Sequence, residues 1–357
     1  MTHHEFICGD AQQAMQTLPS ESVHCIVTSP PYWGLRDYGV AGQLGSEDTP
    51  EEYIRELVQV SREMRRVLRN DGTLWLNLDD TYRDKQLLGI PWRVALALQA
   101  EGWYLRIDNV WDKPNGMRES VTDRPTRMHE YMFLLTKSSR YFCDMDAIRE
   151  PYAESSRPGE IYIGLVRKAY KTAMAQNPSD TKRRILESMR QRRGANKGSV
   201  WTIPVTPFPG AHFATFPPDL VEPCILAGTS KRGCCPECGA PYAREVVRTG
   251  HVNRREEAHA PNNCPTKTDS TGWAPVSVAT DNWNPTCDCN ARDSIPCTVL
   301  DPFGGSGTVS MVAQKLGRNS IYIDLNREYM DMAIKRCGLT EQRIFPIATY
   351  AVREVPA

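Results

Sequence analysis

The sequence lacks the features of membrane-spanning and secreted proteins. No run of about 18 apolar residues occurs, so no segment is predicted to cross a bilayer. The residues from Met1 to Glu5 contain neither the basic nor the apolar stretch of a signal peptide. Hydrophobic residues nevertheless make up 40% of the 357 residues, which is enough for a sizeable core. We therefore expect a folded cytoplasmic protein with no membrane partner.

A net charge is also absent, because 43 Lys and Arg residues balance 43 Asp and Glu residues. The overall charge therefore gives no sign of nucleic-acid binding. Residues 151–200, however, carry 11 Lys and Arg against 4 Asp and Glu. Such a segment can neutralise backbone phosphates, although a solvated helix or a mobile loop would have the same composition.

Internal repeats are absent, and apolar runs of strand length alternate with segments of helical spacing. The sequence predicts strands at 6–8, 23–27, 73–78, 109–111, 130–135 and 320–324, and helices at 50–69 and 91–101. A turn is expected at Asn70-Asp71-Gly72. Strands that alternate with helices indicate a parallel-type α/β sheet.

Residues 299–309 read as a strand, a Gly-rich turn and the start of a helix. Glycines let the backbone approach a ligand closely, and the helix N-terminus offers free N–H groups. No lysine follows the glycines, which excludes a P-loop, and the Asp-Pro-Phe that precedes them favours the zwitterionic cofactor S-adenosylmethionine. Asp324 ends a strand 17 residues after Gly307 and is placed to meet ribose hydroxyls. A structural turn or a site for an NAD-like ligand is the alternative.

Residues 29–32 form a second motif at the end of a predicted strand. An exocyclic amino nitrogen of a base is a weak nucleophile, because its lone pair is delocalised into the ring. Ser29 Oγ and the Pro30 carbonyl are suited to accept its two hydrogens, and Pro31 helps to stiffen the loop. Tyr32 supplies a face on which an extruded base can stack. An ordinary Pro-Pro turn with a buried tyrosine is the alternative.

The two motifs together resemble those of a known family. Thr28-Ser29-Pro30-Pro31-Tyr32-Trp33, followed much later by Asp301-Pro302-Phe303-Gly304-Gly305-Ser306-Gly307, is similar to the motif pair of beta-arrangement amino-group DNA methyltransferases. These enzymes methylate cytosine N4 or adenine N6, and their target-recognition region lies between the two motifs. Gly9-Asp10 and residues 212–217 match further family positions. The resemblance covers nearly the whole chain apart from the basic and the cysteine-rich segments.

The resemblance implies a fold and roles for individual residues. The fold would be a circularly permuted, Rossmann-like, S-adenosylmethionine-dependent methyltransferase domain with a mostly parallel seven-stranded sheet. Ser29, Pro30, Pro31 and Tyr32 would hold the target base. Phe303, Gly305 and Gly307 would wrap the methionine part of the cofactor, with Asp301 near its amino group and Pro302 in the same binding loop. Asp324 would bind the ribose hydroxyls, Asp10 would lie by the adenine end, and Phe213, Thr215 and Phe216 would line the cofactor pocket.

The serine at the first motif position favours cytosine as the target. Within the family, Asp-Pro-Pro-Tyr tends to accompany adenine N6, and Ser-Pro-Pro-Tyr tends to accompany cytosine N4. We therefore expect site-specific methylation of N4 of a flipped-out cytosine in duplex DNA. An adenine-N6 enzyme of the same family is the nearest alternative. More distant ones are an RNA or protein methyltransferase and a non-catalytic zinc-ribbon DNA-binding protein.

Cysteine is abundant, and seven of the 12 cysteines lie between residues 234 and 297. Such clustering in a cytoplasmic protein favours a metal site over disulfides. Cys235 and Cys238 flank a tight turn of the zinc-knuckle type, and Cys287 and Cys289 supply a second pair for a closed, structural zinc. Cys234 and Cys264 are candidate substitutes. A set of reduced surface cysteines is the alternative.

These patterns divide the chain into five segments. Residues 1–150 and 298–357 are the catalytic and cofactor-binding halves of one methyltransferase domain. Between them we expect a basic insertion at 151–210, which is the candidate target-recognition region, a cofactor-pocket segment at 211–230 and a zinc-ribbon-like insertion at 231–297. Double-stranded DNA is the expected partner, and a cognate restriction endonuclease is a candidate second partner.

Overall fold

The computed structural model describes residues 1–35, 42–151, 195–206, 216–249, 276–291, 293–339 and 348–355. The chain divides into two compact units. The first comprises Met1–Ala147, Gly198–Tyr242 and Pro285–Ala357, and the second comprises Ile148–Lys197 and Ala243–Asn284. Most of the basic insertion, as well as Phe213, Thr215 and Cys264, lies outside the described residues.

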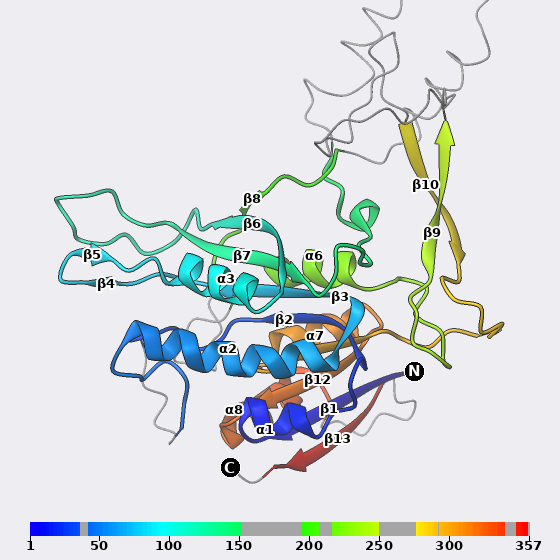
Figure 1. Ribbon diagram of the computed structural model, residues 1–357, viewed down its shortest axis with the longest axis horizontal. Helices are drawn as coiled ribbons and strands as arrows, with labels where there is room; N and C mark the ends of the chain where they lie inside the picture. The colour runs from blue at the N-terminus through cyan, green and yellow to red at the C-terminus, as the bar shows by residue number, and fades with distance from the viewer. Residues whose placement is uncertain are drawn as a thin grey trace, which may run out of the picture. The chain divides into compact units, whose positions relative to one another are not determined.

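A nine-stranded sheet forms the centre of the first unit (Figure 1). Every neighbouring pair of strands is parallel except the two pairs that β7 makes with β3 and β6. In order across the sheet, the strands are β13 (Ala348–Glu354), β1 (Thr2–Cys8), β12 (Asn319–Asp324), β11 (Thr298–Asp301), β2 (Val23–Thr28), β3 (Leu68–Leu78), β7 (His129–Thr136), β6 (Tyr104–Asp112) and β8 (Val200–Thr202).

The predicted α/β fold with a mostly parallel sheet is confirmed, but the expected number of seven strands is wrong. Two further strands extend the sheet, one at each edge. β13 pairs with β1 along seven residues, and β8 pairs with three residues of β6.

The turn expected at residues 70–72 is also wrong. The helix ends at Val67, and Leu68–Leu78 is one strand whose register with β2 shifts between Val23 and Cys25. Gly72 lies at this irregularity, where a Cβ atom would approach Leu68 Cδ1 to 2.6 Å and the His24 carbonyl oxygen to 2.8 Å. The glycine therefore permits close packing of two strands instead of a reversal of the chain.

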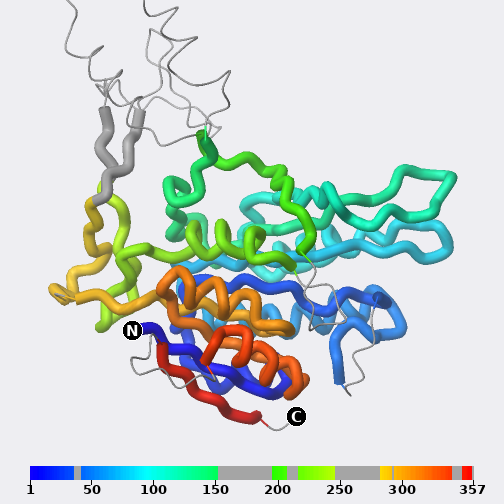
Figure 2. Tube along the Cα trace, turned by 180° about the vertical axis from the view of Figure 1, so that it is seen from behind, coloured from blue at the N-terminus to red at the C-terminus, as the bar shows by residue number. Residues whose placement is uncertain are grey.

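Helices cover both faces of the sheet. α1 (Ala11–Gln16), α2 (Pro50–Val67) and α3 (Ile90–Ala100) pack side by side on the face that is in front in Figure 1. α6 (Pro218–Gly228), α7 (Thr308–Lys315) and α8 (Arg327–Arg336) cover the opposite face, which is in front in Figure 2. The arrangement has the layers of a doubly wound α/β domain.

Helix α2 shows why these segments fold as they do. The Thr49 side chain caps its first turn by accepting a hydrogen bond from the Glu52 amide at 3.2 Å, and Pro50 occupies the first helical position. Arg65 and Arg66 lie in the last turn, where cations complement the helix dipole. Its apolar side packs into the main core, in which Tyr53, Leu57, Met64, Ile26 and Leu74 are all buried.

The remaining elements are small. β4 (Tyr82–Arg83) and β5 (Gln86–Leu87) form a hairpin, and η1 (Met145–Ile148) is one short 3-10 turn. β9 (Ala243–Thr249) and β10 (Val276–Asn284) pair as an antiparallel ribbon within the second unit. In the described part of the chain, no helix is long and apolar enough to span a membrane.

The parallel strands end at a common edge of the sheet. β1, β2, β3, β11 and β12 all run in the same direction, so the residues that follow them gather there. This edge is where open α/β sheets bind their ligands.

Candidate active site

A cavity of about 920 Å³ opens at the carboxyl edge of the sheet. It is large enough for a cofactor of nucleoside size together with a base. Both motifs found in the sequence contribute to its wall. The predicted site residues that line it are Asp10, Ser29, Pro30, Pro31, Tyr32, Phe216, Pro302, Phe303, Gly305 and Asp324. Asp301 and Gly307 belong to the same strand and loop but do not line the cavity.

The Gly-rich loop needs its glycines for two different reasons. Gly305 has φ +47°, and a Cβ atom there would meet no atom within 4 Å, so its backbone is open to a ligand. Gly307 has φ +77°, and a Cβ atom there would approach Ala333 Cβ to 2.5 Å. The first glycine therefore allows close approach of a ligand, and the second allows the loop to pack on α8.

Several side chains hold this loop in place. Asp324 Oδ2 accepts a hydrogen bond from the Gly305 amide at 2.7 Å, and the Tyr322 hydroxyl donates to the Gly305 carbonyl at 2.7 Å. Arg336 Nη1 donates to the Ser306 carbonyl and to Thr308 Oγ1 at 3.1 and 2.9 Å. The loop is therefore fixed before any ligand arrives. Asp324 retains lone pairs that ribose hydroxyls can use, because each carboxylate oxygen has two acceptor sites.

Asp301 connects the two motifs beneath the cavity. Thr28 Oγ1 donates to Asp301 Oδ1 at 2.7 Å, and the Phe303 amide donates to the same oxygen at 3.1 Å. Asp301 Oδ2 is buried without a hydrogen-bond partner. Burial raises the pKa of Asp301 to about 7, and the Thr28 hydroxyl opposes this shift. An acceptor without a partner is therefore buried directly before Pro302 and Phe303, which line the cavity.

Hydrogen bonds with neighbouring segments hold the loop after β2 in place. The Tyr53 hydroxyl of α2 donates to the Pro31 carbonyl at 3.0 Å, and Trp33 Nε1 donates to the Glu47 carbonyl at 2.9 Å. Trp33 packs in the main core. These contacts and the two prolines fix the backbone of the Ser-Pro-Pro-Tyr segment.

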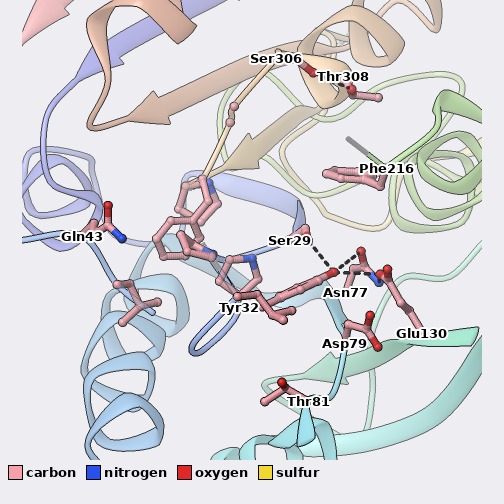
Figure 3. Close-up of a pocket in the computed structure, with 18 of the residues that line it drawn as sticks. Ser29, Tyr32, Gln43, Asn77, Asp79, Thr81, Glu130, Phe216, Ser306 and Thr308 are labelled. Atoms are coloured by element: carbon pink, nitrogen blue, oxygen red, sulfur yellow. Dashed lines mark hydrogen bonds between the residues drawn. The ribbon is translucent and has the colours of Figure 1, made fainter. Parts of the chain in front are cut away.

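Tyr32 lies at the centre of a polar network (Figure 3). Its hydroxyl accepts a hydrogen bond from Ser29 Oγ at 3.0 Å and is within donating distance of Asn77 Oδ1 and Glu130 Oε2, at 3.0 and 2.8 Å. Asn77 Nδ2 also donates to Glu130 Oε2 at 3.0 Å. Burial and the negative charge of Glu130 raise the pKa of Tyr32 well above its usual value. The hydroxyl therefore stays protonated, and the ring is held in one orientation.

The sequence interpretation did not single out Asn77 or Asp79 as site residues, although both line the cavity, as does Glu130. The location of Asn77 and Asp79 at the end of a strand beside β2 was the available signal. Two cations, Lys113 and Arg127, also line the cavity. Lys113 pairs with Glu130, and Arg127 pairs with Asp79 at 2.8 Å.

Two carboxylates therefore lie close to the catalytic motif. Burial and the neighbouring charge of Glu130 raise the pKa of Asp79 to about 6, and Arg127 and Lys113 oppose the shift. The cavity wall near Tyr32 thus contains two carboxylates, and the positive charges of Lys113 and Arg127 largely balance their negative charges.

The four predicted zinc ligands come together in the first unit. The Sγ atoms of Cys235, Cys238, Cys287 and Cys289 all lie within 4.8 Å of one another. Four thiolates on a tetrahedral zinc are about 3.8 Å apart, given zinc–sulfur bonds of about 2.3 Å. No disulfide forms among the cysteines that the structure describes. The arrangement therefore fits a closed metal site.

The turn between the first two ligands is docked on the sheet. Arg69 Nη1 donates to the Cys238 carbonyl at 2.8 Å, and His24 Nε2 lies 2.8 Å from the Gly239 carbonyl. Since His24 Nδ1 accepts from the Thr298 amide at 3.0 Å, Nε2 is the nitrogen that donates. His24 also lies near Cys234 and Cys297, but both of its ring nitrogens are already occupied by these hydrogen bonds.

Comparison with known proteins identifies the family. The family model described as DNA methylase, of the N6/N4 type, matches residues 23–235 and 297–335. The type II methyltransferase M.SmaI of Serratia marcescens is 35% identical over 361 residues, which cover 93% of this chain and 90% of that protein. M.Cfr9I of Citrobacter freundii, also a type II methyltransferase, is 36% identical over 369 residues, covering 95% and 89%. The chain belongs to the N6/N4 DNA methylase family.

Solved structures share the fold of this methyltransferase. The PvuII DNA methyltransferase, described as cytosine-N4-specific, has a TM-score of 0.57 and 15% identity, with 97% of this chain and 89% of that chain covered. A putative DNA modification methylase of Thermus thermophilus, complexed with S-adenosyl-L-methionine, has a TM-score of 0.50 and 19% identity, with 98% and 99% covered. These structures confirm the fold, whereas the family model and the type II relatives confirm the family resemblance inferred from the two motifs and a function in DNA methylation.

Proposed function

We propose that this methyltransferase transfers a methyl group from S-adenosylmethionine to N4 of a flipped-out cytosine in duplex DNA. The observation that carries the proposal is Ser29, which lines the cavity beside a stacking tyrosine and opposite the Gly-rich loop. The cytosine-N4 specificity stated for the PvuII enzyme supports the choice of target.

The residues at the carboxyl edge fit S-adenosylmethionine. We assign Asp324 to the ribose hydroxyls, Asp10 to the adenine end and Phe303 and Gly305 to the methionine part. Gly305 leaves room for the close approach of a ligand, and Asp301 Oδ2 is a buried acceptor without a partner. When bound there, the cofactor supplies an electrophilic methyl group.

The catalytic loop prepares the amino group of the base. Ser29 Oγ gives its hydrogen to the Tyr32 hydroxyl and so keeps its lone pairs for an N4 hydrogen, while the Pro30 carbonyl accepts the other. Two acceptors would draw N4 toward a pyramidal geometry and aim its lone pair at the methyl carbon. Transfer would break the sulfur–methyl bond, with S-adenosylhomocysteine as the leaving group, and N4 would lose one of its two hydrogens as a proton to solvent. The rate gain comes from this preorganised positioning, because the loop is fixed by its prolines, Tyr53 and Trp33.

Methylation of adenine N6 is the second candidate, because the matching family model covers both N6 and N4 enzymes. The polar network at Tyr32 suits either amino group. Ser29 is the feature that favours cytosine.

The deciding experiment incubates the protein with methyl-labelled S-adenosylmethionine and mixed-sequence duplex DNA, followed by nucleoside digestion and mass spectrometry. We expect N4-methylcytosine, lost in Ser29→Ala and Asp324→Ala but retained in Ser22→Ala, whose hydroxyl is exposed and bonded to the Pro19 carbonyl. N6-methyladenine would contradict the assignment of the target. No methylated nucleoside would redirect the search to RNA or protein.

We further propose that Cys235, Cys238, Cys287 and Cys289 bind one structural zinc. The four sulfur atoms already converge, and no position remains for a catalytic water. The first pair precedes β9 in the chain and the second follows β10, so the metal would tie together the two segments that flank these strands in the sequence. The carbonyls bonded to Arg69 and His24 would dock the knuckle on β2 and β3.

The type II relatives suggest a cognate restriction endonuclease as a partner and the bacterial cytoplasm as the location.

We also infer that the two motif halves are circularly permuted. β2, which leads into the catalytic motif, comes before its sheet neighbour β11, which leads into the Gly-rich loop, in the chain.

A further inference from the structure

Met117 is a large apolar side chain that projects into solvent at the mouth of the cavity. It is 93% exposed, more than any other large hydrophobic residue in the described part of the chain. It also lines the cavity that contains Ser29 and Tyr32. Leu35, which follows the catalytic motif, is 46% exposed and lines the same cavity. Met117 and Leu35 are therefore two exposed apolar side chains that border the same cavity.

The loop that carries Met117 is anchored at its base. Asn115 Nδ2 donates to the Val205 carbonyl at 2.9 Å, and the Val205 amide donates back to Asn115 Oδ1 at 2.7 Å. The Lys113 amide donates to the Met128 carbonyl at 2.8 Å, and the Gly116 amide donates to the Lys113 carbonyl at 3.0 Å. The turn just before Met117 is thus held by the backbone of neighbouring segments.

The same loop is braced along its length by the β4–β5 hairpin, and the two project side by side from the sheet (Figures 1 and 2). The Arg124 guanidinium lies 3.8 Å from the centre of the Tyr82 ring, and Lys85 Nζ pairs with Asp123 at 3.1 Å. Arg127, at the end of the loop, pairs with Asp79. Met117 is therefore presented to solvent by a supported loop.

We propose that Met117 enters the base stack of the DNA and fills the space left by the extruded target base. This inference rests on the proposed action on duplex DNA. A flipped base leaves an apolar gap between its neighbours, and proteins fill such gaps with apolar wedges that include methionine. The unbranched thioether adapts to irregular gaps. Met117 lines the same cavity as Tyr32, on whose ring the extruded base would stack.

A wedge lowers the cost of extruding a paired base, so its loss should matter less when the target is already unpaired. We would compare kcat/KM of the wild type and Met117→Ala on a duplex with a paired target and on one with a mismatched target. Met117→Ala should lose about tenfold or more on the paired duplex and little on the mismatched one. Met117→Leu should restore most of the activity. Leu87→Ala, at an exposed hairpin residue outside the cavity lining, is the matched control.

A second measurement does not depend on methyl transfer. A 2-aminopurine at the position of the target base should become fluorescent on binding the wild type, and much less so with Met117→Ala. Equal losses on both duplexes, or an unchanged fluorescence response, would overturn the role of Met117. Loss of self-association in Met117→Ala, with DNA kinetics unchanged, would reassign the side chain to an interface between copies. Failure of the proposed target would be recognised separately, as a different methylated nucleoside from the wild type.

Discussion

The Tyr32 hydroxyl and Glu130 Oε2 lie 2.8 Å apart and join the catalytic loop to the start of β7, the one strand of the sheet that is antiparallel to its neighbours. Asn77 at the end of β3 contacts both side chains. This contact fixes the ring against which the target base would stack, and it accounts for the buried location of a carboxylate in the wall of the site.

Tyr32→Phe keeps the stacking face but removes the hydroxyl that bonds to Ser29, Asn77 and Glu130. The loss of one such buried group costs about 1–3 kcal/mol, so we expect kcat to fall about 10- to 100-fold while the affinity for S-adenosylmethionine is unchanged. Steady-state kinetics and calorimetry would measure the two effects. Tyr141→Phe, which affects only an exposed contact with Arg106, is the control. An equal loss of cofactor affinity would contradict a role confined to the base.

Asp301 should make the stability of the cofactor-free protein depend on pH. Burial raises its pKa from 3.8 to about 7, so the folded state binds the proton more tightly than the unfolded state. The carboxyl therefore lowers the free energy of unfolding progressively as pH rises from about 4 to about 7, with no further change above that range. Urea titrations across this range should show a shallower decline in Asp301→Asn. Parallel curves for the two proteins would refute a buried, proton-binding Asp301.

Gly307→Ala should weaken cofactor binding, because the new methyl group would approach Ala333 Cβ to 2.5 Å and displace the loop from α8. Gly317→Ala provides a matched control. Gly317 has a similar φ of +71°, but a Cβ atom there would meet nothing within 4 Å. Calorimetric titration with S-adenosylmethionine should therefore show at least a tenfold loss of affinity for Gly307→Ala alone. The same loss in both variants would mean that backbone strain, and not contact with α8, controls the site.

Zinc should copurify with the protein at one ion per chain. Chelation should release it and lower the melting temperature, because the metal would hold together two segments about 50 residues apart in the chain. Cys289→Ser should lower the metal content, whereas Cys8→Ser, outside both cysteine clusters, should not. Cobalt substitution would report thiolate ligation through its absorption spectrum. Absence of metal from the freshly purified protein would contradict the proposal.

The motifs of this site could be predicted from the sequence because each is local. A strand that ends in Ser-Pro-Pro-Tyr, and another that ends in a Gly-rich turn, place their residues at the carboxyl edge of any parallel sheet. The grouping of Cys235 and Cys238 with Cys287 and Cys289 could likewise be predicted, because each pair of cysteines is closely spaced in the sequence.

The residues that the sequence did not reveal depend on contacts between distant segments. The direction of β7 leaves no trace in its apolar pattern, yet that direction brings Glu130 to the carboxyl edge of the sheet. Likewise, β13 joins the sheet only through β1, more than 300 residues earlier in the chain, and its mixed composition gives no strand periodicity. The prediction of a turn at Gly72 was wrong because the glycine is needed for the close approach of His24 on the neighbouring strand β2, which the local sequence does not show.

We propose that Ser29, the first residue of the catalytic motif, directs methylation to cytosine N4. The most direct measurement is nucleoside mass spectrometry of chromosomal DNA from cells that express the wild type or Ser29→Ala in a host without other amino-group methylation. We expect N4-methylcytosine with the wild type and none with the variant. N6-methyladenine in the wild-type sample, or N4-methylcytosine undiminished in the Ser29→Ala sample, would contradict it.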